Sequence, residues 1–216
     1  MEGYPNLLSP PLLGYPSPSS NGDYESDPRF LWLSLLSRDL SVTPQVVPMS
    51  RASYPYEHIQ LEKDGHVAWL RFNRVTKANA MNYAHLWEVE HAALSLRDEA
   101  DIRVVIITGN GPHFCSGADL SDSGEPDDMP LVLRRRRARM GERAIEAVLD
   151  IDQITIAAWH GAAMGGGACL ATACDFRIGS EDCFMQYPEI DIGINLMWKS
   201  LPLLVNLIGP ARAKRL

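Results

Sequence analysis

Residues 161–175 read GAAMGGGACLATACD, with three consecutive glycines at the start of an apolar run of small residues. The stretch before them, ITIAAWHG at 154–161, is typical of a buried strand, and the run after them predicts a helix. Glycine inside a helix costs about 0.5–1 kcal/mol relative to alanine, so the triplet needs a reason. The first amides of a helix lack partners and lie at the positive end of its dipole, and glycine lets a ligand approach them.

The residues leave two explanations of the triplet open. A phosphate-binding P-loop needs Lys and Ser/Thr directly after its glycines, but Ala168 and Cys169 follow here, and the GxGxxG spacing of dinucleotide-binding folds is absent. The loop therefore fits an oxyanion hole, in which backbone N–H groups bind an oxygen that gains negative charge during a reaction. The alternative is close packing of a helix against a sheet, which small residues also permit.

A second loop favours the oxyanion hole. HFCSGADL at 113–120 also follows a pattern typical of a buried strand, RVVIITG at 103–109, and Gly117–Ala118 again expose backbone amides. Two such junctions can direct two N–H groups at one oxygen. Asp119 can cap the following turn or act in catalysis, and we prefer the cap.

The remaining pattern alternates strands and helices, which predicts an α/β fold. Asn82 is expected to cap a helix through residue 100, whose buried face carries Leu86, Val89, Ala93 and Leu96. The other expected elements are two strands around an Asp-Gly turn (56–74), one helix of about 20 residues (129–150), short strands at 176–180 and 183–189, and a helix from Leu196 to about Leu207.

Composition limits the class of protein. The 216 residues carry 20 basic and 27 acidic side chains, for a net charge of −7, and 46% are hydrophobic. A core of useful size is therefore expected, and the acidic balance argues against nucleic acid as a partner. RRRRAR at 134–139 is interpreted as a solvated helix face. The four cysteines lack CxxC spacing and are expected to be reduced thiols, and no metal-binding motif is present.

The first 48 residues differ from the rest because they hold 8 of the 15 prolines. We expect 1–48 to be a disordered or loosely ordered extension and 49–216 to be the folded unit, with a docking tail as the alternative. The apolar stretch FLWLSLL at 30–36 is too short to span a bilayer, so no membrane partner is expected. The N-terminus lacks the basic region of a secretory signal, which favours a cytoplasmic protein.

Four stretches in order give the chain, from about Tyr56 onward, a specific resemblance to the crotonase, or enoyl-CoA hydratase/isomerase, superfamily. The resemblance implies an α/β fold of repeated ββα units that acts on acyl-CoA thioesters. Coenzyme A would be part of the substrate, with no permanently bound cofactor. The four stretches are RFNRVTKANAMN (71–82), VVIITGNGPHFCSGADL (104–120), ITIAAWHGAAMGGGACLATACDFRIGSED (154–182) and FMQYPEIDIGI (184–194).

The resemblance also implies a set of site residues. The family holds the thioester oxygen with two backbone N–H groups, which correspond here to Ala118 and Gly166. Lys77 would pair with a CoA phosphate. The other substrate and CoA contacts would be Ala78, Ala80, Ser116, Gly117, Asp119, Leu120 and Gly165.

The acid–base residues depart from the hydratase pattern of two glutamates. Cys169 stands where the first is expected, two residues after the triple glycine, and is interpreted as a small buried hydrophobe. Glu189 stands at the second position. If the apolar residues near it in sequence also surround it in space, desolvation raises its pKa towards the range of a general base. Those residues are Phe184, Met185, Ile190 and Ile192.

A single base can carry a proton from C2 to C4 of a 3-enoyl-CoA, so the sequence predicts an enoyl-CoA isomerase with Glu189 as catalytic residue. Asp191 is a possible helper acid, and Met197 and Trp198 can wall the acyl pocket or pack in the core. The alternatives are an enoyl-CoA hydratase, an acyl-CoA thioester hydrolase and a non-catalytic acyl-CoA-binding remnant. The family continues beyond the equivalent of 208–216 into helices that cover CoA and support a homo-oligomer, a trimer or hexamer, so their absence raises the binding-only alternative.

Overall fold

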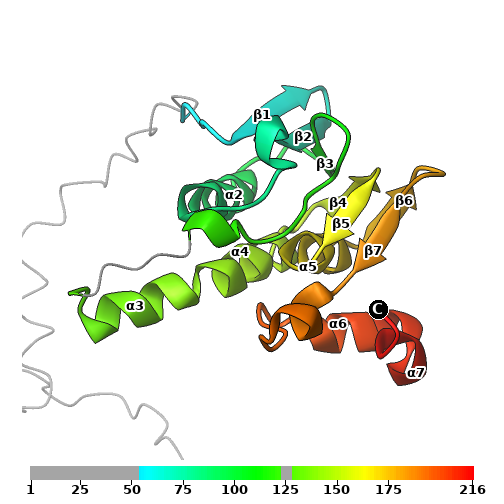
Figure 1. The fold of residues 1–216 in the computed structure, drawn as a ribbon. Helices are drawn as coiled ribbons and strands as arrows, with labels where there is room; N and C mark the ends of the chain where they lie inside the picture. Colours follow the sequence, from blue (N-terminus) through cyan, green and yellow to red (C-terminus); the bar gives the residue numbers. More distant parts are fainter. Residues whose placement is uncertain (1–53, 123–127) are drawn as a thin grey trace, which may run out of the picture. The chain divides into compact units, whose positions relative to one another are not determined.

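The computed structural model describes residues 54–122 and 128–216, so the expected extension over 1–48 lies outside the described residues and that boundary stays a prediction. Within Tyr54–Leu216 a five-stranded sheet has the order β1-β2-β3-β4-β6, and β5 pairs with β7 in a second sheet (Figure 1). The strands are β1 (Ile59–Asp64), β2 (Val67–Phe72), β3 (Val104–Gly109), β4 (Ile154–Trp159), β5 (Ala162–Met164), β6 (Phe176–Gly179) and β7 (Phe184–Gln186).

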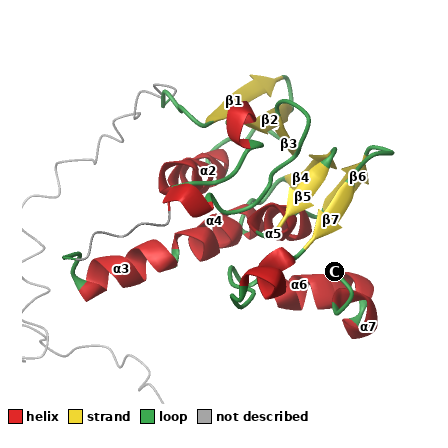
Figure 2. Cartoon of the chain, in the orientation of Figure 1, coloured by secondary structure: helices red, strands yellow, loops and turns green. Residues whose placement is uncertain are grey.

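The strand pairings confirm the α/β class. The Asp-Gly turn joins β1 and β2 in an antiparallel pair that runs from Ile59 opposite Phe72 to Asp64 opposite Val67. All later pairings, β2–β3, β3–β4, β4–β6 and β5–β7, are parallel and need crossover connections, which the helices supply (Figure 2). The helices are α2 (Tyr83–Leu96), α3 (Leu131–Ala138), α4 (Met140–Leu149), α5 (Gly166–Ala173), α6 (Ser200–Ile208) and α7 (Pro210–Ala213).

One face of the main sheet forms the core. Along β2 the side chains of Ala68, Leu70 and Phe72 are buried, while the residues between them are half-buried. The same alternation holds over the first four residues of β3 and in much of β4. There the strands, expected from their apolar runs to be buried, are fully buried on one face only. The helix α2 packs against α4, which in turn contacts α5.

The helix α2 confirms its expected cap and buried face but ends early. The side chain of Asn82 accepts a hydrogen bond of 2.9 Å from the amide of His85. The four apolar residues expected on its inner face are all buried. The helix stops at Leu96, the last of them, rather than at residue 100. The polar residues beyond it, RDEAD, have no apolar face to bury, and packing supplies most of a short helix's stability.

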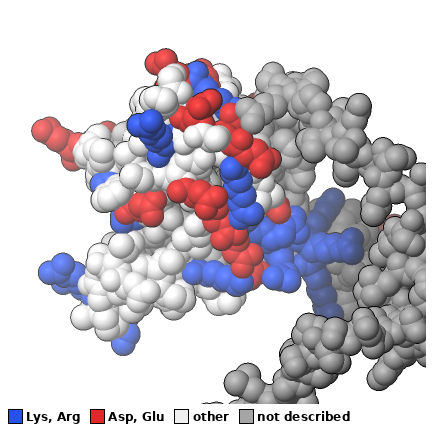
Figure 3. All heavy atoms as spheres, turned by 180° about the vertical axis from the view of Figure 1, so that it is seen from behind, with Lys and Arg blue, Asp and Glu red and all other residues white. Residues whose placement is uncertain are grey.

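The expectation of one helix over 129–150 is wrong, because two helices meet at Arg139, whose φ and ψ are −92° and 2°. All of the buried residues of this region belong to α4, among them Ala144, Ile145 and Val148. The helix α3 has none. Its arginines form the predicted solvated face, and Figure 3 shows Lys and Arg gathered over this part of the surface.

The helix expected from Leu196 begins instead at Ser200. Trp198 and Lys199 have φ values of 60° and 56°, in the left-handed region, which interrupts a right-handed helix at this point. The short strand β5 has no counterpart in the sequence prediction, since its three residues are small or unbranched. Among the described residues, no helix has the length and apolar character that a membrane crossing needs.

Candidate active site

The two glycine loops lie against each other because the segment around Cys115 pairs with β5. The amide of Cys115 donates to the Ala162 carbonyl at 3.0 Å, and the amide of Met164 donates to the Cys115 carbonyl at 3.0 Å. Gly117 follows with a φ of 101°, and a Cβ on it would lie 2.8 Å from the Met164 carbonyl and 3.5 Å from the Gly166 amide nitrogen. Glycine at 117 therefore permits the close approach of the two loops.

The amides of Ala118 and Gly166 are the two donors expected in the oxyanion hole. Ala118 bridges to Met81 through its two neighbours: the Met81 amide donates to the Gly117 carbonyl and the Asp119 amide donates to the Met81 carbonyl. Gly166 is the first residue of α5, so its amide has no acceptor within the helix. Among the described residues, neither amide donates to a backbone carbonyl. Both residues line one cavity of about 110 Å³, which supports the predicted oxyanion hole.

Glu189 lines the same cavity. It lies in the 3₁₀ turn Pro188–Ile192, and its Oε1 atom is 3.0 Å from the position of a Cβ on Gly165. Its Oε2 atom is buried and has no hydrogen-bond partner among the described residues. Burial raises the pKa of this carboxyl above its ordinary value, and the partial opposing effect of a backbone hydrogen bond does not cancel it. An unpartnered carboxylate of raised pKa suits a general base.

The apolar surroundings of Glu189 differ from the expectation. Ile190 is 86% exposed and Phe184 is 48% exposed, so these two sequence neighbours do not meet the condition set for them, that they surround the carboxyl in space. Asp191 is exposed and does not line the cavity. The apolar lining consists of Leu120, Ile192, Ile194, Met197 and Trp198, together with Pro188. Most of these residues are distant from Glu189 in sequence or follow it by several positions.

Cys169 occupies the cavity wall as a protonated thiol. Its side chain is 1% exposed, and its Sγ donates to the Ser200 hydroxyl at 3.0 Å. Burial raises the pKa of this thiol to about 12. A group of that pKa stays neutral near pH 7 and cannot replace a carboxylate as a base. The described part of the cavity wall therefore carries a single acidic side chain, that of Glu189.

The geometry of the glycine triplet fits both explanations that the sequence left open. Gly165 has a φ of 47°, and its amide donates to the Gln186 carbonyl at 2.9 Å. A Cβ on Gly166 would overlap the Trp198 indole. A Cβ on Gly167 would overlap the Cys115 carbonyl, so close packing is required in addition to the free amide.

The other predicted contacts divide into two groups. Ser116, Gly117, Leu120 and Gly165 line the cavity, whereas Lys77, Ala78, Ala80 and Asp119 do not. The exposed Lys77 nevertheless lies beside the site, because its carbonyl accepts a bond of 3.4 Å from the Ser116 hydroxyl.

Asp119 has the preferred role of a cap. Its Oδ1 accepts from the Ser121 amide and hydroxyl, and its Oδ2 pairs with Arg74 at 3.0 Å. The Arg74 guanidinium also donates to the Ala80 carbonyl. Arg74 was not among the residues predicted from the sequence. It joins the segment around Ala80 to the loop that carries Ala118 and Asp119. Within residues 54–122 and 128–216, no cluster of three or more His, Cys, Asp or Glu side chains is placed to hold a metal ion.

Asn79 is a second residue that sequence reasoning missed. It is completely buried with a φ of 57°, and its side chain accepts from the Arg74 amide at 3.0 Å. Its amide group donates to the carbonyls of Asn110, His113 and Phe114. The available signal was an asparagine between two alanines, since asparagine tolerates the left-handed region and bonds backbone groups.

Replacing Asn79 with Gly is expected to lower the free energy of unfolding by about 2–4 kcal/mol, since buried carbonyls and one amide lose their partner. Glycine keeps the positive φ accessible, so the loss reports the side chain. Urea unfolding measures it. Asn110→Gly, at a partly exposed position, serves as control. Equal stability of Asn79→Gly and the wild type would mean that the hydrogen bonds of the Asn79 side chain do not stabilise the fold.

A comparison of the chain with family models gives one match over residues 62–216, to the model described as Enoyl-CoA hydratase/isomerase. The chain belongs to the enoyl-CoA hydratase/isomerase family. The peroxisomal Delta(3,5)-Delta(2,4)-dienoyl-CoA isomerase of Arabidopsis thaliana is 36% identical over 178 residues, which cover 78% of this chain and 64% of that protein. The crotonyl-CoA hydratase of Syntrophomonas wolfei is 33% identical, over 74% of this chain and 61% of that protein.

Solved structures of the family share the fold. The crystal structure of an enoyl-CoA hydratase from Bacillus anthracis matches with a TM-score of 0.67 and 35% identity, over 74% of this chain and 62% of that one. A putative enoyl-CoA hydratase from Streptomyces coelicolor matches with a TM-score of 0.70 and 27% identity, over 78% and 63%. The chain thus spans about three fifths of the length of the enoyl-CoA hydratase/isomerase relatives it matches, and its own activity is a matter for proposal.

The raised pKa of Glu189 predicts a stability effect with a definite sign. A carboxyl whose pKa is higher in the folded state stabilises the fold below its unfolded pKa, and this contribution is lost as pH rises through the folded value. Glu189→Gln is therefore expected to melt at a higher temperature than the wild type at pH 8. The difference should shrink as pH falls towards 4.5, as a series of thermal melts would show. A lower melting temperature for the variant at pH 8 would contradict the unpartnered state of Oε2.

Proposed function

We propose that the chain is an enoyl-CoA isomerase that moves the double bond of a 3-enoyl-CoA to the 2-position with Glu189 as its single acid–base group. One observation carries the proposal. Among the described residues that line the cavity, Glu189 is the only acid, and it shares the cavity with the free amides of Ala118 and Gly166. Cys169, which stands where the hydratase pattern has its first glutamate, is a neutral thiol.

The geometry supports a proton transfer through an enolate. The thioester oxygen accepts hydrogen bonds from the amides of Ala118 and Gly166, which stabilise negative charge on that oxygen. Glu189 removes a proton from C2, and the electrons of the C–H bond pass into the enolate, conjugated with the C3–C4 double bond. The protonated carboxyl then delivers the proton to C4. The double bond now lies between C2 and C3, the carbonyl is restored, and Glu189 is again ionised.

The substrate partner follows from the same proposal. Coenzyme A enters as part of the thioester, with Lys77 at the rim of the site available to a phosphate group. Oligomer formation stays a prediction. The hydratase reaction is supported by the similarity to hydratases, among them the 33% identical crotonyl-CoA hydratase and the 35% identical enoyl-CoA hydratase from Bacillus anthracis. It needs a second group to position water, however, and Cys169 is poorly suited to that role.

Mass-resolved product analysis tests the function. Purified protein receives 3-hexenoyl-CoA in one tube and 2-hexenoyl-CoA in another, with Glu189→Gln as the matched variant. We expect conversion of the first substrate without change of mass, and its loss in the variant. Addition of water to the second substrate would favour the hydratase, and release of free CoA would favour the hydrolase. Binding without turnover would leave the binding-only alternative.

A further inference from the structure

Trp198 stands between two hollows of the molecule. The active-site cavity measures about 110 Å³, and a second cavity of about 390 Å³ lies next to it, lined by residues that include Ala138 at the end of α3, Glu142 of α4 and Leu201 of α6. Met197 and Trp198 are the two described residues that line both cavities. These side chains therefore form the wall between the space beside Glu189 and the larger hollow.

The position of the indole is fixed from two sides. A Cβ on Gly141 of α4 or on Gly166 of α5 would overlap the Trp198 ring, so the ring lies against the backbone of both helices. Alanine at either position would exclude this arrangement. Because Gly141 and Gly166 have no side chains, they leave a slot between α4 and α5 that the planar indole of Trp198 fills. The indole is therefore held in place as part of the cavity wall.

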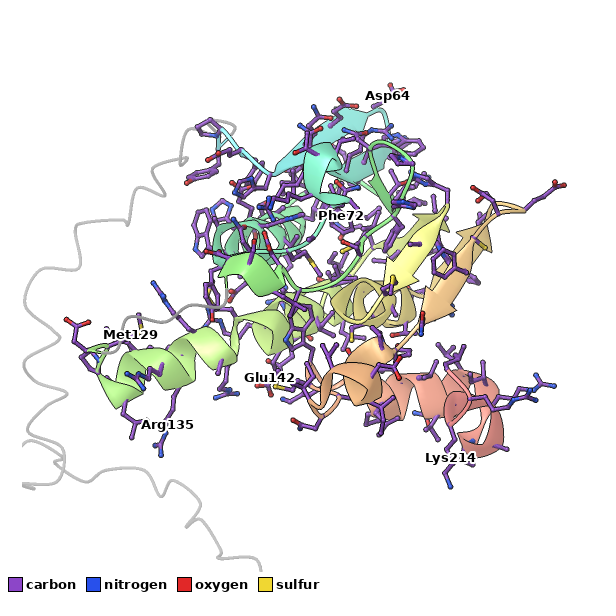
Figure 4. All side chains as sticks on the ribbon, in the orientation of Figure 1. Asp64, Phe72, Met129, Arg135, Glu142 and Lys214 are labelled. Atoms are coloured by element: carbon purple, nitrogen blue, oxygen red, sulfur yellow. The ribbon has the colours of Figure 1, made fainter. Side chains whose placement is uncertain are left out.

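Ion pairs of the next residue, Lys199, hold the backbone around Trp198 in place. Lys199 bonds to Glu142 at 2.6 Å and to Glu146 at 2.5 Å, both on α4, and both Trp198 and Lys199 have left-handed backbone conformations. Figure 4 labels Glu142 where α4 faces the segment that leads into α6. The lysine thus ties the segment to α4 while the indole points into the slot.

We propose that Trp198 determines the acyl-chain length of the substrate, limiting it to about five or six carbons by closing the active-site cavity from the larger hollow. An apolar cavity of about 150 Å³ holds a benzene ring, with six carbons. A cavity of about 110 Å³ correspondingly holds about four or five carbons beyond the thioester carbonyl. The inference rests on the proposed acyl-CoA substrate and names its class, the short-chain thioesters.

Removal of the Trp198 indole joins the two cavities, so that longer acyl chains can bind in the space of the larger one. Trp198→Ala and the milder Trp198→Leu are compared with the wild type by calorimetric titration with butyryl-, hexanoyl-, octanoyl- and decanoyl-CoA, which are saturated and cannot react as proposed. In the wild type, Kd is expected to fall by about fourfold per added CH₂ up to hexanoyl-CoA and to change little beyond it. In the Trp198 variants the fall is expected to continue, so that decanoyl-CoA binds at least about tenfold more tightly than to the wild type.

The matched control is Trp87→Ala, which removes an indole that stacks on His91 at the surface of α2, away from both cavities. It should keep the wild-type profile of chain length. Circular dichroism melts identify variants that fail to fold, and the leucine variant keeps the test valid if the alanine variant is one of them.

The outcomes separate this inference from the proposed isomerase. Wild-type protein that binds short-chain thioesters selectively but isomerises none of them would support the chain-length limit set by Trp198 and contradict the proposed isomerase activity. Wild-type protein that isomerises 3-hexenoyl-CoA and 3-decenoyl-CoA equally well, with no change in the Trp198 variants, would contradict only the chain-length limit set by Trp198. Failure of both the wild type and the variants to bind any of the four thioesters would also overturn it.

Discussion

Replacing Glu189 with Gln is expected to lower kcat for 3-hexenoyl-CoA by about 10²–10⁴-fold while the substrate still binds. The amide keeps the size of the side chain but cannot accept the C2 proton. Among the described residues of the cavity wall no other side chain can take over, because the Cys169 thiol is protonated and has a pKa of about 12. Initial rates of 2-hexenoyl-CoA formation measure the loss.

The pH profile of the wild type carries the same prediction. The rate kcat/KM should fall on the acid side as Glu189 becomes protonated, at a pH above the ordinary value of a glutamate because burial raises this pKa. Asp191→Asn is the matched control, since Asp191 lies two residues away in the same turn but is exposed. Activity that survives Glu189→Gln and is lost in Asp191→Asn would contradict the assignment.

Removing the amide hydrogen of Gly166 is expected to lower kcat by about 10²–10³-fold, the usual loss of one oxyanion-hole donor. Proline removes this hydrogen, and Gly166 is the first residue of α5, where a helix tolerates proline. Any side chain at 166 would overlap the Trp198 indole, so the substitution is made in a Trp198→Ala background.

The comparison is with Gly166→Ala in the same background, which adds a Cβ but keeps the N–H group. The two double variants should have similar melting temperatures and differ in the rate of isomerisation. Equal rates would mean that the Gly166 amide does not bind the thioester oxygen in the transition state, and the oxyanion hole would have to lie elsewhere.

The sequence predicted the strands other than β5, the Asn82 cap and the two glycine loops because those features are local. Alternating or β-branched runs, an N-cap residue and glycines next to a helix start each have a short-range signal. The unbonded amide of Gly166 could be anticipated on the same ground, since a helix start leaves its first N–H groups without partners.

The features that the sequence did not predict depend on contacts between distant segments. The break between α3 and α4 follows from which part of the region packs on the core, and the delayed start of α6 follows from the ion pairs of Lys199 and the slot for Trp198. The hydrogen bonds of Asn79 reach residues more than 30 positions away. No local pattern carries such information.

The most direct test of the single acid–base group is a single-turnover reaction of 3-hexenoyl-CoA that carries two deuterium atoms at C2, with enzyme in excess in ordinary water. Because Oε2 of Glu189 is buried without a partner, the deuterium it removes from C2 should be delivered to C4, and the product should carry deuterium at both positions. Mass and NMR spectra of the product locate the label. A product with deuterium at C2 and only hydrogen at C4 would mean that the deuterium does not stay on Glu189 until the transfer to C4, and would contradict the direct transfer by one buried base.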